Sequence, residues 1–151
     1  MLTKLLPDQI SKFWDIIKYG IEHSLPPTVG EHPDKMNRIL ASLLSSKMQC
    51  WASYTKSEEG NKFEGIIITK LLYDDSSNTK NLLIYCLYGY ENVDTQSWPN
   101  GFDKIALYAK SLGCAKVVAY TSIPHMIEVA KHLGADTSYT FVSFDLQKFV
   151  K

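Results

Sequence analysis

Residues 81–90 read NLLIYCLYGY, and this stretch decides the fold. Apolar side chains occupy successive positions rather than alternate ones, so both faces of an extended chain would be apolar. Residues 74–80, before this stretch, are polar and typical of a turn, and residues 91–101, after it, are expected to form a loop. The pattern predicts a central strand that other elements cover on both faces.

The expected order of helices and strands differs between the two sides of this strand. Before it we expect a strand, two helices and two further strands, and after it helices that alternate with strands. The expected ranges are, in chain order, a strand at 2–6, helices at 8–24 and 33–46, strands at 49–55, 62–73 and 81–90, a helix at 102–113, a strand at 115–121, a helix at 124–133 and a strand at 138–146. This β-α-α-β-β-β-α-β-α-β order predicts an α/β (α+β) fold in a single domain, residues 1–151, with a mixed central sheet of about six strands and helices on both faces.

The overall charge narrows the range of partners. Sixteen basic and sixteen acidic residues cancel, and Arg38 is the one arginine. A neutral chain gives no electrostatic reason to expect a nucleic acid or an anionic membrane as partner.

The three cysteines have no CxxC spacing, which excludes a zinc ribbon and favours a reducing compartment. No apolar run approaches the ~20 residues of a membrane helix, so we expect a cytoplasmic protein.

Two stretches resemble the GNAT superfamily of N-acetyltransferases. The start, MLTKLLPDQISKFWDII, is similar to the family's first strand with its acidic N-cap and amphipathic helix. The later stretch LYAKSLGCAKVVAYTSIPHMIEVAKHLGA is similar to the cofactor-side helix, fifth strand, fourth helix and closing Leu-Gly. The resemblance implies a GNAT-like three-layer fold in which acetyl-CoA lies between two splayed parallel strands. It also implies that Tyr88, Gln96, Asn100, Gly101 and Phe102 contact coenzyme A, if coenzyme A binds.

The expected cofactor loop departs from the family pattern Gln/Arg-x-x-Gly-x-Gly/Ala. Gln96 and Gly101 match it, but Pro99 stands at the place of the first glycine. Proline removes an amide donor and adds a ring where the backbone should approach a phosphate. No lysine or arginine lies between Lys80 and Lys104 to neutralise the diphosphate. The sequence therefore predicts a poor pyrophosphate cradle.

The catalytic groups implied by the resemblance are also incomplete. Matching on the closing Leu133-Gly134 puts Ala130 where the family has a tyrosine general acid, and alanine cannot protonate a leaving thiolate. Glu91, at the end of the central strand, stands where some family members keep a general base. The alternative is that Glu91 is a solvated loop carboxylate.

Other candidates have two interpretations each. Tyr88, Tyr90 and Trp98 either line an acyl or adenine pocket or cap the core where the strands diverge. His125 is either a base at a helix start or a surface residue. The four histidines show no metal-site spacing, so no metal is expected, and the cysteines are interpreted as core residues.

The function predicted from these observations is a GNAT-like domain that has lost acetyltransferase activity and serves as a structural or binding module. Its expected partner is a protein or an assembly, with a homo-oligomer as one form, and no cofactor is expected. Small proteins of this kind occur among bacteriophage products, so the predicted location is the host cytoplasm or the virion. The alternative is an active acetyl-CoA-dependent N-acetyltransferase with an atypical loop, and a third hypothesis is a domain that reuses the cleft for another ligand. The sequence past Leu146 leaves little room for the family's seventh strand, so the acceptor side of the cleft is expected to be either open or completed by a partner.

Overall fold

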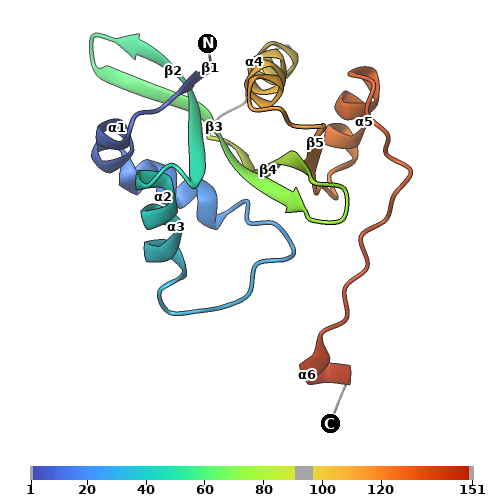
Figure 1. Ribbon diagram of the computed structural model, residues 1–151. Helices are drawn as coiled ribbons and strands as arrows, with labels where there is room; N and C mark the ends of the chain where they lie inside the picture. Colours follow the sequence, from blue (N-terminus) through green and yellow to red (C-terminus); the bar gives the residue numbers. More distant parts are fainter. Residues whose placement is uncertain (1, 91–96, 150–151) are drawn as a thin grey trace. The chain divides into compact units, whose positions relative to one another are not determined.

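The computed structural model describes residues 2–90 and 97–149 of the 151-residue chain, with the backbone alone for residues 56, 57, 61 and 97–100. The chain divides into two compact units, residues 1–119 and 120–151. The single domain 1–151 expected from the sequence stays a prediction. The first unit contains, in chain order, β1 (Leu2–Lys4), α1 (Pro7–Lys12), α2 (Trp14–Glu22), α3 (Lys35–Leu44), β2 (Met48–Ser57), β3 (Gly60–Asp74), β4 (Thr79–Gly89), α4 (Ser97–Ser111) and β5 (Lys116–Ala119) (Figure 1).

The five strands of the first unit form one mixed sheet. Their order is β1-β2-β3-β4-β5, so each strand lies beside its neighbour in sequence. The first four strands pair antiparallel, and β5 pairs parallel with β4. A parallel pair needs a crossover, which α4 supplies between β4 and β5. The expected mixed sheet and α/β (α+β) class are confirmed, with β4 as the predicted central strand.

Helices cover both faces of the sheet in this unit. Ile66 and Ile68 of β3 belong to a buried cluster with α1, α2 and α3, whereas Ile67 belongs to a second cluster with Ile105 and Ala109 of α4. Because successive side chains of a strand point to opposite faces, the two clusters lie on opposite sides of the sheet. Figure 1 shows α1–α3 grouped together and α4 apart from them. The unit therefore has three layers.

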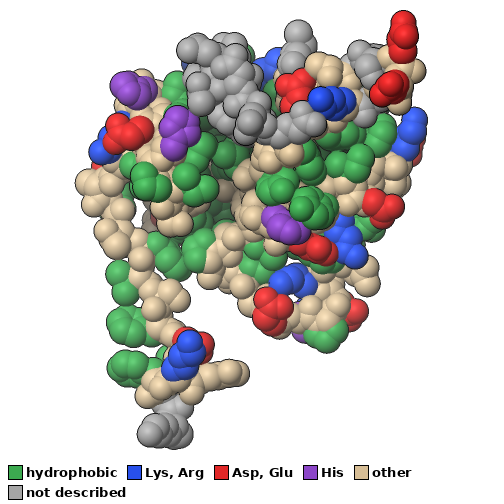
Figure 2. Space-filling view, turned by 180° about the vertical axis from the view of Figure 1, so that it is seen from behind, with side chains coloured by type: hydrophobic (Ala, Val, Ile, Leu, Met, Phe, Trp, Pro, Cys, Tyr) green, Lys and Arg blue, Asp and Glu red, His purple; other side chains and the backbone are tan. Residues whose placement is uncertain are grey.

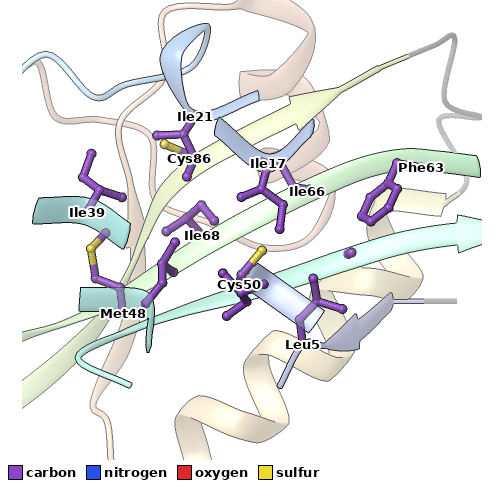
Figure 3. Close-up of a cluster of buried hydrophobic side chains, with 13 residues drawn as sticks. Leu5, Ile17, Ile21, Ile39, Met48, Cys50, Phe63, Ile66, Ile68 and Cys86 are labelled. Carbon is purple, nitrogen blue, oxygen red and sulfur yellow. The ribbon is translucent and has the colours of Figure 1, made fainter. Parts of the chain in front are cut away.

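The larger cluster holds α2 against the middle of the sheet. Ile17 and Ile21 of α2 are fully buried and meet Ile66, Ile68 and Cys86, as Figure 3 shows. Burying one such aliphatic side chain contributes about 1.5–3 kcal/mol. This contact fixes the end of α2 beside β3 and β4.

Two helix boundaries differ from those expected. The helix predicted at 8–24 is two helices, α1 and α2, which meet at Phe13, where φ is −106° and ψ is 20°. The apolar spacing continues through this break, so periodicity alone did not reveal it. The helix predicted to start at Phe102 begins at Ser97, because proline is compatible with a first helical turn.

The second unit contains α5 (Pro124–His132) and α6 (Leu146–Phe149). The strand predicted at 138–146 is wrong: residues 138–145 form no strand, and Leu146 begins α6. An alternating pattern makes a strand only where another strand pairs with it. The sheet consequently has five strands in the described residues instead of about six.

A chain of hydrogen bonds crosses the buried face beneath α4. The indole Nε1 of Trp51 donates to Thr69 Oγ1 at 3.1 Å, and that hydroxyl donates to Gln49 Oε1 at 2.8 Å. Gln49 Nε2 in turn donates to the carbonyl oxygen of Ser46 at 3.0 Å. Thr69 is fully buried, and its hydroxyl is hydrogen-bonded to both the Trp51 donor and the Gln49 acceptor.

Thr69→Val should therefore destabilise the protein by about 1–3 kcal/mol, because the Trp51 donor and the Gln49 acceptor lose their shared partner. Urea denaturation measures the change. Thr55→Val, at an exposed position of β2, is the matched control and should stay within about 0.5 kcal/mol of wild type. Equal effects of the two substitutions would show that the hydrogen-bond chain contributes nothing to stability.

Candidate functional site

β4 and β5 pair over only part of the length of β4. Their parallel register runs from Asn81 opposite Lys116 to Ile84 opposite Ala119. β4 then continues to Gly89, while β5 ends at Ala119. Among the residues that the structure describes, the second half of β4 therefore pairs with no strand on the side away from β3, and this opening is the candidate site.

A β-bulge marks the point where the two strands part. Thr69 of β3 lies opposite Ile84, and Ile68 lies opposite Cys86, so Tyr85 is an extra residue in β4. A bulge bends its strand and increases the local twist. The bulge thus directs the second half of β4 out of the ladder that its first half forms with β5.

The main-chain groups that face the opening can be assigned from the ladder with β3. The amide of Tyr90 donates to the carbonyl oxygen of Glu64 at 3.0 Å, which makes these residues a bonded pair. Bonded and non-bonded pairs alternate in an antiparallel ladder, so Tyr88 opposite Ile66 is also bonded. The N–H and C=O groups of Leu87 and Gly89 consequently point away from β3 and into the opening.

An aromatic group lies at the same end of β4, on the face covered by α2. The Tyr19 and His23 rings of α2 and its C-cap have centroids 4.1 Å apart, and Tyr88 lies 5.9 Å from Tyr19 and 6.0 Å from His23. His23 Nδ1 lies 2.7 Å from the carbonyl oxygen of Tyr19, a contact that favours the tautomer with the proton on Nδ1. Burial first, and then the hydrogen bond and charge interaction with Tyr19, raise the pKa of Tyr88. The sequence analysis did not identify Tyr19 and His23 as neighbours of Tyr88, because no local pattern shows that α2 packs against β4.

Tyr90 connects β4 to α2. Its hydroxyl donates to the carbonyl oxygen of Ile16 at 2.7 Å. Burial first, and then the neighbouring Cys50 and Tyr88, raise the pKa of Tyr90, so the phenol stays protonated as that donor. Of the three aromatic residues proposed to line a pocket or cap the core, Tyr88 and Tyr90 pack against the buried cluster beneath α2.

The glycine of α2 allows this close approach. A Cβ added to Gly20 would lie 2.6 Å from Tyr90 Oη and 2.8 Å from Ile66 Cδ1. Gly20→Ala should destabilise the protein by about 1–3 kcal/mol, because α2 or Tyr90 must shift. Chemical denaturation measures this, with Gly30→Ala as the control, since a Cβ at Gly30 meets nothing within 4 Å. A Gly20→Ala protein as stable as wild type would contradict the packing described.

The start of α4 carries the residues that the resemblance assigned to the cofactor. Asn100 and Gly101 lie inside the helix rather than in a loop, and Phe102 is half-buried. Gly101 is buried next to β1, where an added Cβ would contact Leu2 at an ordinary 3.5 Å. Gln96 and the candidate base Glu91 lie outside the described residues. The cofactor contacts of Tyr88, Asn100, Gly101 and Phe102 stay predictions.

The first cation after Lys80 in the sequence is bonded to β1. Lys104 Nζ donates to the carbonyl oxygen of Leu2 in β1 at 2.8 Å. Pro99, the third residue of α4, lies in the first turn, where backbone N–H groups have no partner within the helix. One of the donors that an anion would use there is therefore missing.

The remaining sequence candidates, His125 and Ala130, lie in α5 of the second unit. His125 is exposed near the start of α5, and Ala130 is half-buried in the same helix. In the described part of the chain, no group of three or more His, Cys, Asp or Glu residues could hold a metal ion. No helix among the described residues has the length and apolar character needed to span a membrane.

The interpretation of the cysteines as core residues is confirmed for two of the three. Cys50 and Cys86 are buried, whereas Cys114 is half-buried. Burial raises the pKa of Cys50 to about 12 and that of Cys86 to about 11, so both stay as unreactive thiols.

A thiol-reactive chromogenic disulfide should therefore modify one thiol per native chain rapidly, and all three after denaturation. Cys114→Ser should abolish the rapid phase in the native protein. Rapid modification that persists in Cys114→Ser would mean that Cys50 or Cys86 is accessible.

Solved structures of other proteins have a similar fold. No protein-family model matches the sequence, and no curated protein matches it. A predicted acetyltransferase from Clostridium acetobutylicum, solved with acetyl-CoA, is similar in structure, with a TM-score of 0.69 and 16% identity over 98% of this chain and 97% of that one. An aminoglycoside acetyltransferase, meta-AAC0020, from an uncultured soil metagenomic sample, solved with sisomicin, has a TM-score of 0.71 and 14% identity over 96% of this chain and 93% of that one. The chain therefore has the GNAT fold, as the resemblance implied.

Proposed function

We propose that this protein is a GNAT-fold binding module that engages a protein partner and does not transfer acetyl groups. The observation that carries the proposal is the start of α4. There Pro99 removes a first-turn donor, and Lys104, the nearest cation along the helix, is bonded to Leu2 instead. A diphosphate needs both free amides and positive charge, and this helix start offers few of the first and none of the second among the described residues.

The catalytic side chains support the same proposal. Ala130 stands where the family has its tyrosine acid, and it carries no proton to donate. The phenol of Tyr90 is engaged as a structural donor to α2. The lysine-rich composition, with Arg38 as the one arginine, fits a gene from an AT-rich genome, which supports a phage product that acts in the host cytoplasm or the virion.

Acetyl-CoA titration followed by thermal unfolding tests the proposal. A ligand at 100 times its dissociation constant stabilises a protein by about 2.7 kcal/mol, so binding of acetyl-CoA would raise the unfolding temperature measurably. We expect no shift for wild type and a measurable shift for Pro99→Gly, which restores the missing amide. Pro27→Gly, in the exposed loop before α3, is the control and should not respond. Saturable binding of acetyl-CoA by wild type would overturn the proposal.

A second candidate, an acetyl-CoA-dependent N-acetyltransferase with an atypical loop, is favoured by one observation. β4 and β5 still part after Ile84, and the main-chain groups of Leu87 and Gly89 face the opening. Backbone donors in such a place can stabilise a tetrahedral oxyanion without a side-chain acid. Amine-dependent release of free coenzyme A thiol from acetyl-CoA would establish this candidate and exclude the first.

A further inference from the structure

We draw no further inference here: the strongest candidate, the aromatic cluster of Tyr19, His23 and Tyr88 where the end of α2 meets the end of β4 (Figure 2 shows one face of the molecule), belongs to the site already described, and nothing in the structure shows what covers it.

Discussion

β4 is hydrogen-bonded along its length to β3 but along only its first half to β5, and this asymmetry governs the rest of the molecule. The full ladder with β3 holds β4 in the middle of the sheet, where α2 covers one face and α4 the other. The bulge at Tyr85 and the end of β5 at Ala119 then leave one edge of β4 beyond Ile84 without a paired strand among the described residues. Leu87 is half-buried and Gly89 is exposed on this stretch, and an unpaired strand edge with free N–H and C=O groups is a natural place for a ligand or a partner.

Much of the fold could be predicted from local pattern. The doubly apolar run at 81–90 identified the central strand, and the glycines at 113 and 134, both with positive φ, marked the ends of two helices as expected. The strand at 138–146 could not be judged in the same way. Alternating apolar and polar residues can form a strand only beside the edge of another strand, and the sequence does not show which strand offers that edge.

The candidate site was predictable only in part. The resemblance pointed to the end of β4 and the start of α4, but the contact of Tyr88 with Tyr19 and His23 depends on how α2 crosses the sheet. That crossing is set by the lack of a side chain at Gly20, a tertiary fact that no local pattern contains. The residues around Pro99 predict a loop, whereas the helix begins two residues before this proline.

The most direct measurement is amide hydrogen exchange, residue by residue, along β4 of the protein without added ligand. If β4 is bonded to β3 alone beyond Ile84, the amides of Cys86, Tyr88 and Tyr90 exchange slowly and those of Leu87 and Gly89 exchange fast. Slow exchange at all five positions would mean that a strand of the same chain already fills the opening, and the free edge of β4 would not exist.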